Sequence, residues 1–159
     1  LSKEKIKKLD IEPIIKSVVD DFNNIYKVKR GINISYKNDG KNKYLIYGIE
    51  NRIEQIIANL LDNAISFSDD NKDVIVQVSK SEDNKVYIKI LDEGQGFKEK
   101  DTNKIFKRFY SNRPDKFGQH SGLGLNIVKN LVDLHNATIK ATNREDKKGA
   151  SMEIEFPKV

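Results

Sequence analysis

The sequence contains no cysteine, no tryptophan and only three prolines among its 159 residues. The absence of cysteine excludes disulfide bonds and thiol chemistry. No apolar run approaches the roughly 20 residues that a membrane-spanning helix needs. The chain does not open on the pattern of a secretory signal peptide. We therefore expect a cytosolic domain.

Charge of both signs is abundant, with a net charge of +5 that makes the chain basic. A basic domain can bind nucleic acid, a membrane surface or polyphosphate. The lysines are scattered along the chain rather than clustered, and together with abundant asparagine and isoleucine they are also typical of a biased genome composition. The charge alone therefore assigns no partner. The length fits one domain with a core of its own.

The apolar spacing of amphipathic helices occurs in 11–28, 50–67 and 123–134. Pro13 lies near the first turn of the first of these helices, where proline is tolerated. The charged residues 1–10 are sparse in apolar side chains and are expected to form a linker or the end of a preceding element.

Alternating or β-branched runs predict the strands of a sheet. They are 32–36, 44–47, 74–78, 86–91, 138–142 and 151–156. Asp39-Gly40 between the first two runs and residues 81–85 between the next two predict two hairpins. Helices mixed with hairpins predict an α+β fold, a two-layer sandwich in which helices cover one face of a mixed sheet.

Amide side chains form a stripe beside the apolar face of the helix 50–67. Gln55, Asn59 and Asn63 follow one another at four-residue spacing. Asparagine is a modest helix former that prefers caps and turns, so two of them on one stripe invite a functional reason. An amide oxygen is a hard neutral ligand suited to Mg²⁺ or its waters. A solvated helix face explains the stripe equally well on this segment alone.

Glycine is concentrated after the strand 86–91. Asp92 ends that strand, and Gly94 and Gly96 follow it. A carboxylate at this position could accept a hydrogen bond from the amino group of adenine, while the glycines let the backbone approach the base. The alternative is an ordinary aspartate-containing turn.

A second glycine pair lies where the long irregular segment 93–121 becomes a helix. Ser121, Gly122 and Gly124 lie at that helix start, where free N–H groups favour phosphate. The alternative is a glycine-rich cap. The sequence has no G-x-x-x-x-G-K-[ST] motif, so a P-loop is excluded. Within the long segment, IFKRFYSNRP (105–114) combines aromatic residues with cations that could cover phosphates.

These motifs occur in a fixed succession over residues 55–125: an asparagine-bearing helix, D-x-G-x-G, F-x-x-F-Y and G-x-G-L. In this order they resemble the N, G1, F and G2 boxes of sensor histidine kinases, which belong to an ATPase superfamily shared with gyrase, Hsp90 and MutL. The resemblance covers 11–159 and implies a Bergerat-type ATP-binding fold. The sequences of three segments resemble in particular those of the envelope-sensing kinases of α-proteobacteria: NAISFS, RFYSNRP and FGQHSGLGL.

The resemblance implies ATP and Mg²⁺ as ligands and gives each matching residue a role. Asn63 matches the metal-coordinating asparagine, and Asp92 matches the aspartate that reads adenine. Asn59 takes the place of a glutamate that serves as general base in ATP-hydrolysing relatives; an amide cannot do this, so hydrolysis should be slow. The implied nucleotide-binding residues are Asn59, Asn63, Asp92, Gly94, Gly96, Ser121, Gly122, Leu123, Gly124, Leu125 and Ser151.

Catalysis is assigned by the same resemblance to Asn59, Arg108 and Arg113, the two arginines stabilising phosphoryl charge from the loop over the site. Two positions depart from the family pattern. Many members carry a cation where this chain has Ser66, and an arginine where it has Ser111. Arg108, Arg113 or Lys107, on the loop over the site, could supply the positive charge that these two positions lack.

Only two histidines are present, and neither has the surroundings of a phosphoacceptor. His120 lies beside the second glycine pair, and His135 ends a helix, where imidazolium would suit the dipole. The acceptor is therefore expected on an upstream dimerisation domain. Residues 1–10 are expected to be the remnant of that helix or linker, and 11–159 the catalytic domain.

The resemblance implies a protein histidine kinase domain of a two-component system, which binds Mg-ATP and donates the γ-phosphoryl group to a histidine on a separate dimerisation domain. A response regulator would be an indirect partner. The parent is expected to be a membrane-anchored homodimer of the bacterial inner membrane, with this domain in the cytoplasm.

Alternative functions are a nucleotide-sensing pseudokinase, a serine kinase of the anti-sigma type and a nucleic-acid-binding domain. The intact glycine boxes argue against the first and the F box against the second. The third lacks clustered basic residues interleaved with exposed aromatics, so no nucleic-acid partner is expected.

Overall fold

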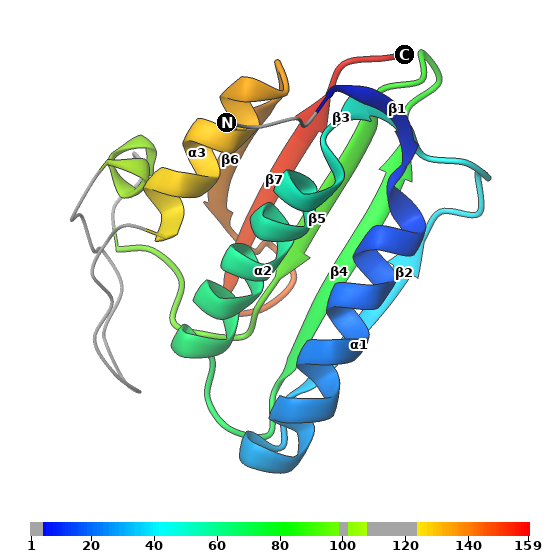
Figure 1. The fold of residues 1–159 in the computed structure, drawn as a ribbon. Helices are drawn as coiled ribbons and strands as arrows, with labels where there is room; N and C mark the ends of the chain where they lie inside the picture. The colour runs from blue at the N-terminus through cyan, green and yellow to red at the C-terminus, as the bar shows by residue number, and fades with distance from the viewer. Residues whose placement is uncertain (1–4, 99–101, 108–123) are drawn as a thin grey trace.

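A mixed sheet lies behind a layer of helices, so the molecule has two layers (Figure 1). The computed structural model describes residues 5–98, 102–107 and 124–159. The strands are β1 (Lys7–Asp10), β2 (Asn33–Asn38), β3 (Leu45–Gly48), β4 (Asp73–Lys80), β5 (Val86–Leu91), β6 (Thr138–Asn143) and β7 (Ala150–Phe156). The helices are α1 (Ile11–Arg30), α2 (Glu50–Phe67) and α3 (Gly124–Leu134), with a 3₁₀ turn η1 (Asn103–Phe106). This arrangement confirms the predicted α+β sandwich.

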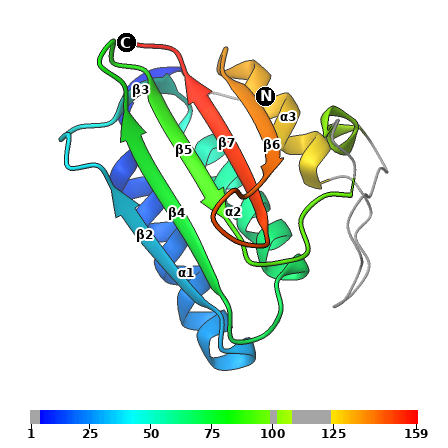
Figure 2. The same ribbon diagram turned by 180° about the vertical axis from the view of Figure 1, so that it is seen from behind.

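The main sheet has five strands in the order β2-β4-β5-β7-β6. β2 and β4 are parallel, and the other neighbours are antiparallel. The helices cover one face, and Figure 2 shows that none of the helices formed by the described residues lies over the opposite face. The uncovered face is polar in the middle, where Lys89 on β5 and Lys140 on β6 both pair with Glu153 on β7. Lys89 and Glu153 each lie between two buried neighbours, so the alternation of β5 and β7 follows from one covered and one uncovered face.

The core is formed between the sheet and the helices by isoleucine, leucine and valine side chains. α2 contributes the most central part, with Ile53, Ile57 and Leu61 fully buried. The helix boundaries follow local chemistry: Asp10 caps α1 by accepting a hydrogen bond from the backbone N–H of Glu12, and Gly31 ends it in the left-handed conformation. None of the helices in the described part of the chain is long and apolar enough to cross a membrane.

One of the two predicted hairpins is wrong. β4 and β5 do form a hairpin, but β2 pairs in parallel with β4, and β3 pairs with β1. The segment 39–44 instead connects the two sheets, and the Asp39 carboxylate accepts hydrogen bonds from the Tyr44 hydroxyl and from the Lys80 backbone N–H at the end of β4.

The strand β1 was also not expected, since residues 1–10 were predicted to be a linker or the end of a preceding helix. Lys7–Asp10 pair antiparallel with Leu45–Gly48, forming a small second sheet beside the starts of α1 and α2. The start of the catalytic domain at residue 11 stays a prediction. In the structure, β1 is folded together with the rest of the chain through its pairing with β3.

Candidate nucleotide site

Asp92 lies at the end of β5 with 3% of its surface exposed. Its Oδ1 accepts hydrogen bonds from two backbone N–H groups, those of Gly94 (2.9 Å) and Ala150 (3.0 Å). Its own backbone N–H donates to the carbonyl of Ala150 (3.0 Å). A buried carboxylate held by main-chain donors from two segments is fixed in direction. The aspartate predicted to read adenine is therefore a rigid acceptor.

The loop after Asp92 is attached to its neighbours on both sides. Gly94 forms an isolated antiparallel bridge with Ser68, the C-cap of α2. Gly96 has a φ of +76°, which favours glycine, and Phe97 is buried in the core. The two glycines predicted from the sequence thus occupy positions where the backbone makes close approaches.

Ser151 lies on β7, paired across from Leu91 at the end of β5. It is 8% exposed and directly follows Ala150, whose N–H group binds Asp92. The structure therefore brings Ser151, one of the implied nucleotide-binding residues, into the same corner of the sheet as the predicted adenine-reading carboxylate.

The asparagine helix forms the other wall of this region. Gln55, Asn59 and Asn63 are all half-buried, at the boundary between the apolar face of α2 and its surface. The Nδ2 of Asn59 lies 3.5 Å from the carbonyl oxygen of Gly124, the first residue of α3. Asn63 lies on α2 between this contact and the bridge from Ser68 to Gly94. The predicted metal ligand therefore lies between the residues predicted to bind the phosphates, at the start of α3, and the residues predicted to bind the adenine base, after β5.

The start of α3 also contacts the segment of the F box. Ile105 and Phe106 are buried in the core, and the Asn126 side chain donates to the carbonyl of Phe106 (3.2 Å). Leu125 is half-buried and packs on the core. The remaining predicted residues lie outside the described part of the chain: Arg108, Arg113, Ser121, Gly122 and Leu123. Their roles stay predictions.

His135 is buried just beyond the end of α3, and both of its ring nitrogens have hydrogen-bond partners. It is 5% exposed, and its Nε2 lies 3.1 Å from the backbone N–H of Ile49, which can only donate. Its Nδ1 lies 2.8 Å from the carbonyl of Leu131, which can only accept. These contacts make Nε2 the acceptor for the Ile49 N–H and Nδ1 the donor to the Leu131 carbonyl. The ring joins the end of α3 to the start of α2 and does not reach the nucleotide region.

Two residues that the sequence did not single out also belong to the site. Asn143 and Arg144, where β6 turns toward β7, hydrogen-bond to the backbone of Phe97 and Asp92. They escaped notice because they contact residues 46 and 52 positions away and belong to no local motif.

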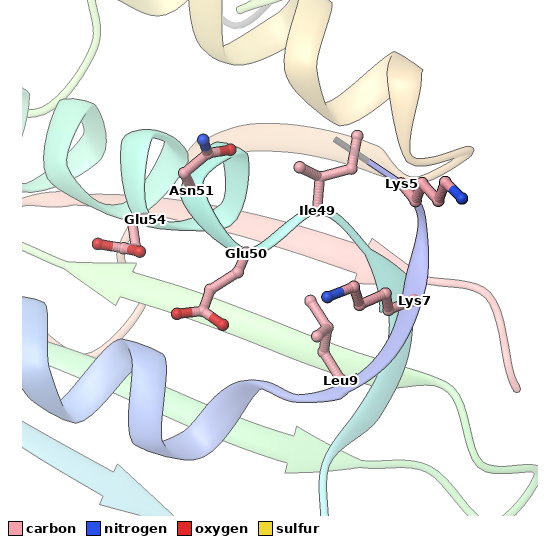
Figure 3. Close-up of a pocket in the computed structure, with 7 residues that line it drawn as sticks. All are labelled: Lys5, Lys7, Leu9, Ile49, Glu50, Asn51 and Glu54. Atoms are coloured by element: carbon pink, nitrogen blue, oxygen red, sulfur yellow. The ribbon is translucent and has the colours of Figure 1, made fainter. Parts of the chain in front are cut away.

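A pocket of about 490 Å³ lies elsewhere, at the N-terminal end of α2. Figure 3 shows Lys7 and Leu9 on β1 extending toward the first turn of α2, where Glu50 lies. Asn63 is about 20 Å further along the helix axis, at 1.5 Å per residue. This pocket is therefore separate from the predicted nucleotide residues.

Comparison with known proteins agrees with this geometry. Residues 48–159 match the family described as histidine kinase-, DNA gyrase B- and HSP90-like ATPase. The sensor protein ChvG of Agrobacterium fabrum is 35% identical over 148 residues, covering 89% of this chain and 25% of that protein. ChvG of Rhizobium meliloti is 33% identical over 156 residues, covering 94% and 27%. The chain thus spans about a quarter of the length of these relatives.

Solved structures show the same fold. The nucleotide-free catalytic domain of the histidine kinase ThkA has a TM-score of 0.82 and 25% identity, covering 97% of this chain and 96% of that one. Full-length ShkA in complex with AMPPNP has a TM-score of 0.79 and 23% identity, covering 98% and 32%. The resemblance to α-proteobacterial kinases that the motifs predicted is confirmed by the similarity to the two ChvG proteins. The chain therefore belongs to the histidine kinase-, DNA gyrase B- and HSP90-like ATPase family, as a catalytic domain of the sensor histidine kinase type.

Proposed function

We propose that this domain binds Mg-ATP and donates the γ-phosphoryl group to a histidine on the dimerisation domain of its parent kinase. The observation that carries the proposal is the Asp92 carboxylate, buried at the end of β5 and held by the N–H groups of Gly94 and Ala150. A fixed carboxylate acceptor beside a glycine loop suits the exocyclic amino group of adenine. It would not suit guanine, which presents a carbonyl oxygen at the corresponding position.

Mg²⁺ would be held by Asn63, with Asn59 one turn earlier on the same stripe of α2. When bound, the ion neutralises charge on the phosphate oxygens. Both amides are hard oxygen ligands that need no deprotonation, and a magnesium ion that keeps several waters needs few protein ligands. The donor chemistry of these half-buried amides therefore fits the ion.

The transferred group moves from ATP to a histidine nitrogen, with ADP as the leaving group. Asn59 supports transfer to histidine over hydrolysis because an amide cannot deprotonate an attacking water. The phosphates would lie at the start of α3, near Gly124 and Leu125, with Ser121, Gly122 and Leu123 before it. Arg108 or Arg113 would stabilise the charge on the transferring group.

The partners follow from this reaction. The acceptor histidine would be supplied by the parent's dimerisation domain, and a response regulator would receive the phosphoryl group afterwards. ThkA has been solved in complex with the response regulator TrrA, and its structure has the same fold as this chain. We place the parent in the bacterial inner membrane as a homodimer, with this domain on the cytoplasmic side.

The test is phosphoryl transfer from γ-labelled ATP to the isolated dimerisation domain of the parent, mixed with this chain and Mg²⁺. Label on the acceptor histidine, absent when that residue is replaced by alanine, is the expected result. Nucleotide binding without any transfer would contradict the kinase assignment and favour a nucleotide-sensing module. If Arg108→Ala or Arg113→Ala lost transfer at nearly normal ATP affinity, the replaced arginine would be the one that stabilises charge on the transferring phosphoryl group.

A further inference from the structure

The turn between β6 and β7 contacts the loop that follows β5. Both ribbon views place the β6–β7 connection at the end of β5 (Figures 1 and 2). Asn143 ends β6, and its side-chain oxygen accepts a hydrogen bond from the Phe97 backbone N–H (2.6 Å). Its amide nitrogen donates to the Phe97 carbonyl (3.1 Å). One side chain thus satisfies both backbone groups of Phe97, as a paired strand would.

Gly96 and Asn143 are fitted to one another. Gly96 has a φ of +76°, and a Cβ atom at this position would lie 2.4 Å from the Oδ1 of Asn143. No side chain could occupy that space while the two hydrogen bonds to Phe97 remain. The amide therefore sets the path of the backbone at the second glycine of the loop.

Arg144 holds the other end of the same loop. Its side chain is only 4% exposed, and its Nη1 donates to the carbonyl of Asp92 (3.1 Å). Asp146 orients the guanidinium by accepting from its Nε (3.0 Å) and Nη2 (2.8 Å). Gly149 completes the contact, since a Cβ atom there would lie 2.0 Å from the Asp92 carbonyl oxygen.

We propose that Asn143 and Arg144 are positioning residues for base recognition, acting through Gly96–Phe97 and Asp92 respectively. The inference rests on the proposed function, in which Asp92 reads adenine. The turn fixes Asp92 through its carbonyl and carboxylate, and it fixes the loop four to five residues later through Phe97. A recognition group held between two anchors selects its ligand more sharply than one on a free loop, because small displacements weaken a directional hydrogen bond.

The experiment measures the affinities of ATP, GTP and inorganic tripolyphosphate for the full chain by calorimetry. Asn143→Ala should weaken ATP binding about tenfold, since two hydrogen bonds that orient the loop are lost. Affinity for tripolyphosphate should be unchanged, so the preference for ATP over GTP should fall. Asn143→Asp keeps the acceptor for the Phe97 N–H but sets a carboxylate oxygen against the Phe97 carbonyl, so it should also reduce the preference for ATP over GTP. Arg144→Met should reduce the same preference.

Asn38→Ala is the matched control, because Asn38 also ends a strand and its amide donates to Glu12, on the far edge of the sheet. It should leave the ATP-to-GTP preference at the wild-type value. Asp92→Asn serves as the reference for full loss of base recognition. An unchanged preference in Asn143→Ala, with full loss in Asp92→Asn, would overturn the positioning role and leave the proposed function intact.

Two further outcomes would also overturn the inference. Equal losses of ATP and tripolyphosphate affinity in Asn143→Ala would mean that the amide only stabilises the fold. An unchanged preference in Asp92→Asn would remove the base-reading residue itself, and the proposed function would then fail together with the inference.

Discussion

At the scale of single residues, Asp92 illustrates how a side chain becomes specific through its surroundings. Its Oδ1 is bound by two backbone N–H groups that belong to the loop after β5 and to the start of β7. The direction of the carboxylate is therefore set by main-chain geometry and not by its own rotamer freedom. The sequence supplied the residue through the D-x-G-x-G motif, but not the donor from Ala150, 58 positions away.

Asp92→Asn should impair base recognition while keeping the hydrogen bonds from the backbone N–H groups of Gly94 and Ala150. The amide oxygen of asparagine can keep both backbone hydrogen bonds, while its NH₂ group replaces a carboxylate oxygen by a donor. We expect binding of ATP and ADP to weaken by about 1.5–3 kcal/mol, the range for a hydrogen bond to a charged group. Calorimetry measures the loss, and the melting temperature should stay close to that of the wild type. Unchanged affinity would remove Asp92 from the site.

Asn63→Ala tests whether the amide of Asn63 binds Mg²⁺. Loss of the amide oxygen should weaken Mg²⁺-dependent ATP binding at least about tenfold, as for other interactions with charged groups. ADP binding in a chelator should change little, because no ion is then present. Asn51→Ala, exposed in the first turn of α2, is the control. Equal losses with and without Mg²⁺ would show that Asn63 contributes packing instead.

At the scale of elements, the helices and the hairpin β4–β5 were predictable because their signals are local. Apolar spacing and the polar turn at residues 81–85 lie within each element. The partners of β2 and β3 were not predictable in this way. Strand alternation identifies which face is buried but not which strand lies alongside, and β1 is a charged segment, KKLD, with no alternation at all.

The contact between α1 and β2 has its own pH dependence. The Oε2 of Glu12 accepts hydrogen bonds from the Tyr36 hydroxyl (2.6 Å) and the Asn38 amide (2.8 Å). The bond from Tyr36 lowers the pKa of Glu12, against the opposing effect of burial. Burial, followed by the bond to Glu12, raises the pKa of Tyr36.

A lowered folded-state pKa means that Glu12 stabilises the fold above the usual glutamate value of about 4.3, and that this contribution is lost as the pH falls through the folded-state pKa. We expect Glu12→Gln to reduce the difference in unfolding free energy between neutral and acidic solution. Urea unfolding across this range measures it. Glu54→Gln, on the exposed surface of α2, is the control. Identical acid profiles for Glu12→Gln and the wild type would contradict the assignment.

At the scale of the whole molecule, the two-layer sandwich was predictable because the number and order of helices and strands leave few ways to bury every apolar face. The site was predictable only in part. Its motifs identify the residues that would touch ATP, while the residues that hold those motifs, Asn143 and Arg144, come from another part of the chain. The strand β1 was not predicted either, and it pairs with β3.

Shortened chains test whether β1 contributes to the stability of the domain. Starting the chain at Ile11 removes β1 and the Asp10 cap of α1, while a start at Lys7 keeps both. Loss of an N-cap alone costs about 1 kcal/mol, and for a domain of this size 1 kcal/mol corresponds to about 2–4 °C. We therefore expect the Ile11 chain to melt at least about 3 °C below the Lys7 chain. Equal melting temperatures would place the boundary of the stable unit at residue 11.

The order of the main sheet leaves β2 and β6 as its two edges. Each edge strand carries an exposed lysine, Lys37 on β2 and Lys140 on β6. Charged side chains on an edge oppose the addition of a further strand, because pairing would desolvate them. If two copies of the domain are held close together in a dimeric parent, these edges, which pair with no other strand of the described residues, meet at high local concentration. The edge lysines would then protect the kinase from joining its own sheets into a continuous aggregate.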